Sequence, residues 1–197
     1  WGVINQMRTS YTPADLQVGF KASPLPGLGF HLFGGYRVTK DEIFHLPGIT
    51  DTDFPYCYSL LMQEKAKVGY GGIKAAYGYK DIFDFSVGGT YYGWNVKDEA
   101  KVLLYLKPEF VLDASARAKV YDEFWISAAY RYEGRVKAGE LEKADAINNL
   151  SLSAGYEFFN SLNVFVRFNN LLNQDYITEA GYPVQGFNAM AGVSFRF

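Results

Sequence analysis

Hydrophobic and polar residues alternate along most of this chain with a period of two. In the clearest stretch, apolar and small residues at even positions oppose a polar and charged set: Phe110, Leu112, Ala114, Ala116, Ala118 and Val120 against Val111, Asp113, Ser115, Arg117 and Lys119. Successive side chains of a β-strand point to opposite faces of the sheet. The stretch therefore predicts a strand with one apolar face and one wet face.

The same pattern recurs from one end of the chain to the other. It predicts strands over residues 16–22, 28–38, 73–80, 83–91, 110–120, 124–133, 150–158, 162–169 and 187–197. Residues 2–10 would add a tenth strand, but they alternate poorly. The expected fold is all-β: an antiparallel up-and-down transmembrane β-barrel segment of about nine to ten strands.

The connections between these strands are expected to alternate in length. Tight turns are predicted at 24–27, 80–82, 121–123 and 159–161, and longer polar connections at 41–65, 96–101, 134–146 and 173–186. Aromatic residues flank the tight turns, as they do where a barrel wall meets lipid headgroups. Short turns on one side and longer loops on the other are typical of outer-membrane barrels, whose turns lie in the periplasm.

Composition restricts the class of protein further. Hydrophobic residues make up 49% of the 197 residues, yet the densest apolar run, 102–106, is far shorter than the roughly 20 residues of a membrane helix. Any membrane role must therefore use strands. The net charge of −2 gives no attraction to nucleic acid. The single cysteine, Cys57, excludes an intrachain disulfide and is expected in a loop.

Candidate chemistry is sparse. His31 and His45 are the only histidines, and no cysteine or carboxylate cluster has the spacing of metal ligands. Neither histidine has a serine partner that spacing alone could establish for nucleophilic catalysis. We therefore expect no enzymatic activity, no metal site and no cofactor.

The carboxy-terminal residues carry a specific motif. Asn169-Asn170-Leu171-Leu172-Asn173-Gln174-Asp175-Tyr176 is followed by Gly181-Tyr182-Pro183, by Gly186 and by a last strand that ends Ser194-Phe195-Arg196-Phe197. This segment resembles the end of a TonB-dependent receptor barrel. The motif residues are Asn170, Leu171, Asn173, Tyr176, Gly181, Pro183, Gly186, Phe195 and Phe197. The resemblance implies that the barrel-assembly machinery reads the terminal strand, with its aromatic residues Phe195 and Phe197.

The resemblance also implies a location and a role. Members of that family carry about 22 strands and an amino-terminal plug, neither of which is present here. We expect residues 1–197 to be one β-barrel unit, the carboxy-terminal part of a larger barrel in the Gram-negative outer membrane. The parent protein would take up a scarce ligand with energy from a TonB-type periplasmic partner. The alternatives are a self-contained small barrel with a structural or adhesive role and a soluble β-barrel that binds a small apolar ligand.

The polar faces of the predicted strands are rich in cations. They carry Lys21, Arg37, Lys74, Arg117, Lys119, Arg131, Arg167 and Arg196, against Asp113, Glu133 and Glu157. In a barrel these faces would line the lumen. Two interpretations follow: the cations belong to a mixed-charge wet wall that pairs with carboxylates of a plug, or they form a pathway that favours anions. The sequence leaves both interpretations open.

Overall fold

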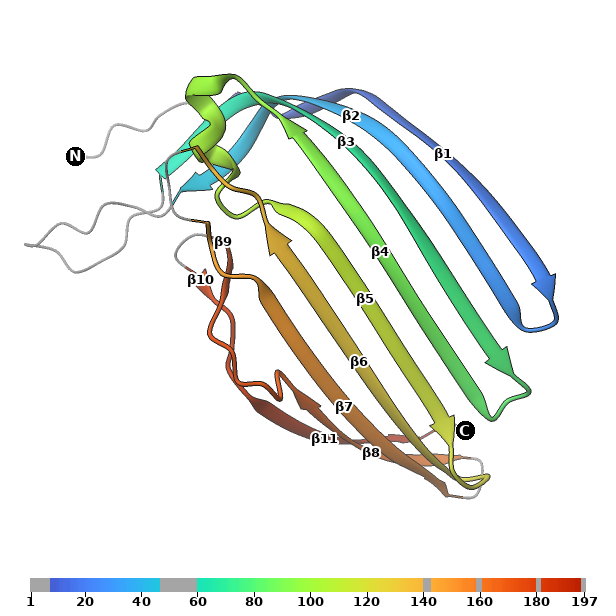
Figure 1. The fold of residues 1–197 in the computed structure, drawn as a ribbon. Coiled ribbons are helices and arrows are strands. Elements are labelled where there is room, and N and C mark those ends of the chain that lie inside the picture. Colours follow the sequence, from blue (N-terminus) through green and yellow to red (C-terminus); the bar gives the residue numbers. More distant parts are fainter. Residues whose placement is uncertain (1–7, 47–59, 140–142, 159–160, 180–181, 196–197) are drawn as a thin grey trace, which may run out of the picture.

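The computed structural model describes residues 8–46, 60–139, 143–158, 161–179 and 182–195. They form one curved antiparallel sheet of nine strands, paired in chain order from β1 to β11 (Figure 1). The strands are β1 Tyr11–Leu25, β2 Leu28–Leu46, β3 Leu60–Tyr79, β4 Phe83–Asn95, β5 Pro108–Lys119, β6 Phe124–Arg135, β7 Ile147–Phe158, β8 Leu162–Asn169 and β11 Asn188–Phe195. The predicted all-β, up-and-down fold is confirmed, but the sheet is open: β1 and β11 are its edges in the described part of the chain.

Short turns lie at one end of the sheet and longer connections at the other (Figure 1). The 3₁₀-helix η1, Asp98–Leu104, lies between β4 and β5, and the small hairpin of β9, Ile177–Glu179, and β10, Tyr182–Pro183, lies between β8 and β11. In η1, the pKa of Asp98 lies below its usual value because Lys101 donates a hydrogen bond to the carboxylate. No described helix is long and apolar enough to cross a membrane.

The prediction of one long connection over 41–65 was wrong. Strand β2 continues to Leu46 and β3 begins at Leu60. Of the tenth strand proposed for residues 2–10, only 8–10 are described, and they are not strand. Cys57 lies outside the described residues.

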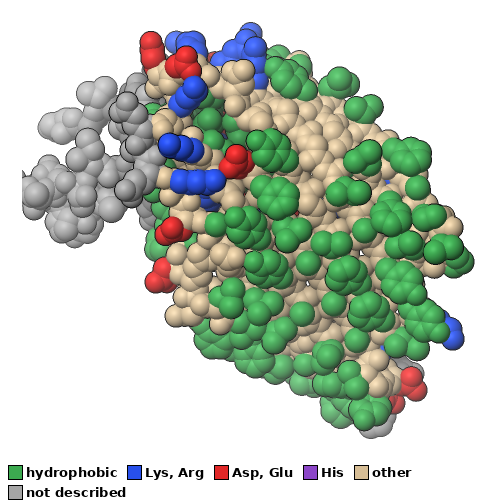
Figure 2. Space-filling view, viewed as in Figure 1, with side chains coloured by type: hydrophobic (Ala, Val, Ile, Leu, Met, Phe, Trp, Pro, Cys, Tyr) green, Lys and Arg blue, Asp and Glu red, His purple; other side chains and the backbone are tan. Residues whose placement is uncertain are grey.

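The two faces of the sheet differ sharply in polarity. The face shown in Figure 2 carries exposed apolar side chains over most of the area in view, while charged side chains gather mainly at the end where η1 lies. Val18, Phe20 and Val193 on this face are 70%, 68% and 67% exposed. On the opposite face, a cavity of about 520 Å³ is bordered by residues from six strands, from Lys21 in β1 to Arg131 in β6. Strands so far apart can border one space only on the inner side of the curve, so the polar face is concave.

A β-bulge in β2 explains why the alternation fails after residue 38. The register shifts by one residue between Thr39 and Glu42, and Asp41 adopts a φ of 53°. Such an extra residue moves the following side chains to the other face of the strand. Phe44 consequently points to the concave side, where it is 1% exposed. It packs there with Ala66, Val96, Ala100, Leu103, Leu104 and Ala138, so that η1 is anchored against the inner wall.

Aromatic rings on the concave face lie over glycines of the neighbouring strands. A Cβ on Gly155 would lie 2.5 Å from Cε2 of Trp125, and one on Gly192 would lie 2.5 Å from Cζ of Phe165. Tyr70 and Phe33 occupy the corresponding space above Gly35 and Gly72. Pairing an aromatic ring with a cross-strand glycine covers backbone that the glycine leaves bare. These glycines are therefore required for the packing of the inner wall.

The polarity of the faces predicts how β5 tolerates charge. Ala116 lies on the apolar face, whereas Ser115 lies on the concave face and its Oγ is 2.8 Å from Oγ of Ser86. In a bilayer, Ala116→Arg should cost about 2 to 4 kcal/mol of unfolding free energy near the midplane, and less toward the interface. Ser115→Arg should cost clearly less. Unfolding titrations in lipid vesicles measure both, and equal losses would contradict the assignment of the faces.

The packing of the Trp125 ring over Gly155 gives a second prediction. Gly155→Ala must displace the indole, which also lies 4.4 Å from the Arg117 guanidinium carbon, measured to the ring centroid. We expect a loss of about 1 to 3 kcal/mol in unfolding free energy, as for overpacked sites, together with a shift of the tryptophan emission. Gly29→Ala is the matched control, because a Cβ there would meet no atom within 4 Å. Indistinguishable effects of the two substitutions would refute the conclusion that Gly155 leaves the space that the Trp125 indole needs.

Candidate functional site

One row of paired residues crosses the concave face from β1 to β7. Strand pairing aligns Lys21 with His31, His31 with Lys74, Lys74 with Gly88, Gly88 with Asp113, Asp113 with Arg131, and Arg131 with Asn149. All but Asn149 border the 520 Å³ cavity. We call this row the central rung. It brings ionisable residues from five strands onto one level of the inner wall.

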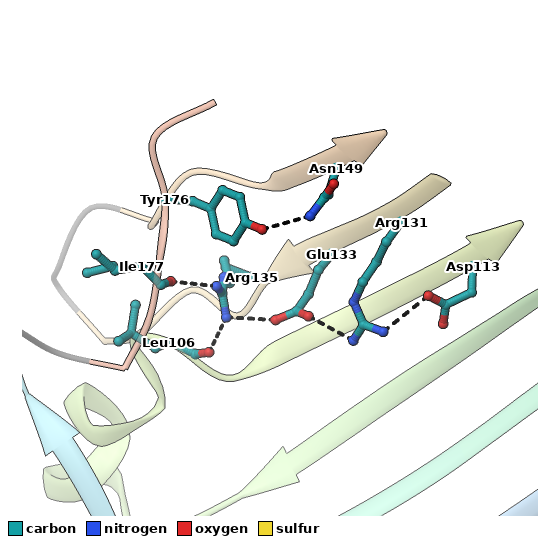
Figure 3. Close-up of polar contacts among 8 residues, drawn as sticks. All are labelled: Leu106, Asp113, Arg131, Glu133, Arg135, Asn149, Tyr176 and Ile177. Atoms are coloured by element: carbon teal, nitrogen blue, oxygen red, sulfur yellow. Dashed lines mark hydrogen bonds and ion pairs between the residues drawn. The ribbon is translucent and has the colours of Figure 1, made fainter. Parts of the chain in front are cut away.

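The β5–β6 part of the central rung belongs to a chain of ion pairs (Figure 3). Arg131 Nη1 lies 3.1 Å from Oδ1 of Asp113, and its Nη2 lies 3.1 Å from Oε2 of Glu133. Glu133 Oε1 in turn lies 2.7 Å from Nη1 of Arg135. Two carboxylates of the same wall therefore compensate the charge of Arg131.

Arg135 ends this chain of ion pairs and joins three segments. Its side chain is 2% exposed. Nη1 donates to the backbone carbonyl of Leu106, and Nη2 donates to that of Ile177 at 2.8 Å (Figure 3). Leu106 lies between η1 and β5, and Ile177 begins β9, so the guanidinium ties two connections to the end of β6. A buried cation needs such compensation, because removing it from water is costly.

Sequence reasoning missed Arg135. The predicted strand ended at residue 133, two positions earlier, and the connection was expected to begin at 134. The available signal was the spacing of Arg131, Glu133 and Arg135, which places alternating charges on one face of a longer strand.

The β1–β3 part of the central rung is not compensated in this way. Neither Lys21 nor Lys74 makes an ion pair with any residue that the structure describes. Lys74 Nζ lies 5.6 Å from the ring centroid of Phe33. The ring centroids of His31 and Phe33 are 5.1 Å apart. Gly88 leaves room for the lysine, since a Cβ there would lie 2.8 Å from Lys74 Cγ.

The other predicted cations have different surroundings. Arg37 pairs with Asp15 at 2.9 Å, and Arg117 lies over the ring of Trp125. Lys119 and Arg167 are exposed and make no ion pair within the described ranges. Arg196 lies outside the described residues. The described cations thus have different surroundings, and their assignment to a barrel lumen stays a prediction.

The carboxy-terminal motif forms a tight joint between β8 and β11. Asn170 is buried and has a φ of 47°. Its Nδ2 donates to the carbonyls of Gln174 at 3.0 Å and Gln185 at 3.3 Å, and its Oδ1 accepts from the Gln174 amide at 3.2 Å. Asparagine adopts left-handed backbone conformations more readily than most residues because its short side chain can bond locally. One side chain therefore holds both ends of the connection.

A second asparagine continues this joint. Asn173 also has a φ of 47°, and its Oδ1 accepts a hydrogen bond from the Phe187 amide at 2.8 Å. A Cβ on Gly186 would lie 2.9 Å from that oxygen, so the position is suited to glycine. Leu171 donates its amide to the Leu150 carbonyl at 2.8 Å, which attaches the joint to β7.

The remaining motif residues extend the contact to β7 and the hairpin. Tyr176 accepts a hydrogen bond on its hydroxyl from Asn149 Nδ2 at 2.9 Å (Figure 3), and Pro183 pairs with Ile177. Phe195 pairs with Leu162 at the turn end of the sheet. Gly181 and Phe197 lie outside the described residues. The described motif residues before β11 thus have a structural role, and recognition of the terminal strand by the assembly machinery stays a prediction.

The sequence matches no protein-family model and no curated protein. Solved structures do match. The copper transporter OprC superposes with a TM-score of 0.67 and 14% identity over 98% of this chain and 32% of its own. The ferric-catecholate import receptor Fiu of Escherichia coli K12 gives 0.66 and 17%, over 93% and 27%. The pyoverdine outer-membrane receptor FpvA of Pseudomonas aeruginosa PAO1, bound to pyoverdine, gives 0.66 and 16%, over 93% and 29%.

This chain spans about a third or less of the length of these proteins. They are described as a copper transporter, an import receptor and an outer-membrane receptor. At such low identity the likeness establishes the fold. It confirms the resemblance read from the carboxy-terminal motif: the chain has the fold of a portion of the barrel wall of TonB-dependent receptors.

Proposed function

We propose that this chain is the carboxy-terminal part of an outer-membrane barrel, in a TonB-dependent receptor-like transporter that takes up a scarce ligand. One observation supports this above all: an open nine-stranded sheet, apolar outside and polar inside, superposes on such receptors over 92–98% of its length. Uptake would belong to the whole protein, because the wall described here covers only part of a barrel.

The apolar outer face supports a membrane location. Side chains such as Leu16, Leu32 and Ile73 are more than half exposed on it, and their neighbours on adjacent strands are apolar as well. A continuous exposed apolar surface of this kind marks an interaction with lipid or with another protein. Lipid fits it best, because the alternation recurs from β1 to β11 and is reversed only in β2 beyond its bulge.

The open edges support a larger barrel. In lipid, unpaired backbone groups of an edge strand find no water to bond, so a spanning sheet has to close. A self-contained small barrel would pair β1 with β11, and these strands are not paired in the part of the chain that the structure describes. Further strands supplied by the parent protein would satisfy both edges.

The soluble-barrel alternative conflicts with the direction of curvature. It needs apolar side chains on the inner face to bind a small apolar ligand. The inner cavity has a mixed lining instead, in which lysine, histidine, serine, threonine, aspartate and arginine stand among apolar residues such as Ala76 and Val111. A polar inner face suits a wet lumen or contact with a plug, and a TonB-type partner would act only through the parent protein.

Uptake by the full-length protein tests this proposal. The neighbours are described as a copper transporter, a ferric-catecholate import receptor and a receptor bound to pyoverdine, so copper, ferric catecholates and pyoverdine serve as labelled probes in cells that express the protein. We expect one of them to accumulate only when the TonB-type partner is present, with the protein in the outer-membrane fraction. Cells that lack the partner but are otherwise identical provide the control. Accumulation that does not depend on the partner, or a protein found in the soluble fraction, would contradict the proposal.

A further inference from the structure

The central rung holds unequal charge on its two sides. On β5 and β6, Asp113 and Glu133 compensate Arg131. On β1 to β3, Lys21, His31 and Lys74 stand side by side, and the pairing places them on three adjacent strands. Neighbouring strands are about 4.8 Å apart, so the backbones of Lys21 and Lys74 are separated by about 10 Å. Flexible four-carbon stems allow both ammonium groups to reach one point between them.

Carboxylates of the same wall do not neutralise this group. On the concave face of β1 and β2, Asp15 pairs with Arg37, and Glu42 lies 3.0 Å from Lys107. Glu64 of β3 lies 3.3 Å from Lys97. Asp84 is four residues along β4 from Gly88, the rung position, which amounts to about 13 Å of extended strand. The described wall therefore leaves a local excess of positive charge at Lys21 and Lys74.

The surroundings also leave space for a ligand. All three side chains border the 520 Å³ cavity on the concave face, together with Ser86 and Thr90. Gly88 adds no side chain at the next rung position, and the stem of Lys74 lies in the space that this leaves. Hydroxyl groups beside ammonium groups provide donors for oxygen atoms of a ligand.

We propose that Lys21, His31 and Lys74 form a binding site for a carboxylate or phosphate group on the inner wall of the barrel. Lysine binds phosphate as a point charge, and two lysines with an imidazole donor between them provide several hydrogen bonds to one anion. The anion is either a free solute in the lumen or an acidic side chain of a protein segment that lies there. The inference deepens the proposed function and rests on it, because only in a barrel does this face line an interior.

Inorganic phosphate tests the site in the full-length protein, purified in detergent micelles. Calorimetric titration should show binding that weakens as salt rises, because exposed charges are screened. Lys21→Gln combined with Lys74→Gln should weaken binding at least tenfold, while Lys21→Arg with Lys74→Arg should retain it. Lys119→Gln is the matched control, since Lys119 is another exposed, unpaired lysine of the described concave face. Equal affinities of wild type and the double glutamine variant, or an equal loss in the control, would overturn the proposal.

A carbodiimide cross-linking experiment distinguishes the two sources of the anion. If a protein carboxylate already occupies the site, phosphate will not bind, and mass spectrometry should find Lys21 or Lys74 joined to an acidic residue by an amide bond. Phosphate binding without such a product identifies a free solute. If phosphate does not bind and no cross-linked product forms, the proposed site is refuted. Should the double variant still reach the outer membrane and take up its ligand in that case, only the anion site fails and the proposed function stands.

Discussion

In the proposed outer-membrane location, the architecture depends on one constraint: a backbone inside lipid has to satisfy its hydrogen bonds within the sheet while only apolar side chains face outward. Each of the nine strands meets the first half of this requirement through antiparallel pairing with its neighbours. The period-two alternation meets the second half, from Leu16 in β1 to Phe195 in β11. The first requirement fails along the outer edges of β1 and β11, which have no partner strand in the described part of the chain, and this is why we propose further strands.

The inner wall follows different rules, because its side chains need not be apolar. Rings such as Trp125 and Phe165 occupy the space above glycines on adjacent strands. Charged residues divide into those compensated within the wall, such as Arg131 and Arg37, and those left uncompensated, such as Lys21 and Lys74. The same strands thereby have an apolar convex face and a concave face on which charged, polar and aromatic side chains are mixed.

The sequence predicted the strands well where alternation is regular, as in β5 and β6. It failed after residue 38, because a single extra residue at Asp41 reverses the faces and hides the continuation of β2. The sequence identified most cations of the polar faces, but it could not show which of them lie next to one another in space. Grouping depends on register between strands far apart in the chain, such as β1 with β2 and β3, and a period of two does not encode that register. Arg135 was missed because the end of its strand was placed two residues too early.

The central claim is that the apolar convex face contacts lipid and the polar concave face does not. Spin labels placed singly at each position from 110 to 118 in β5 test it most directly, in the full-length protein reconstituted in bilayers. The account predicts that even positions are accessible to oxygen, which partitions into lipid, and odd positions to a water-soluble nickel reagent. Accessibility without a period of two, or with the two reagents exchanged, would contradict it.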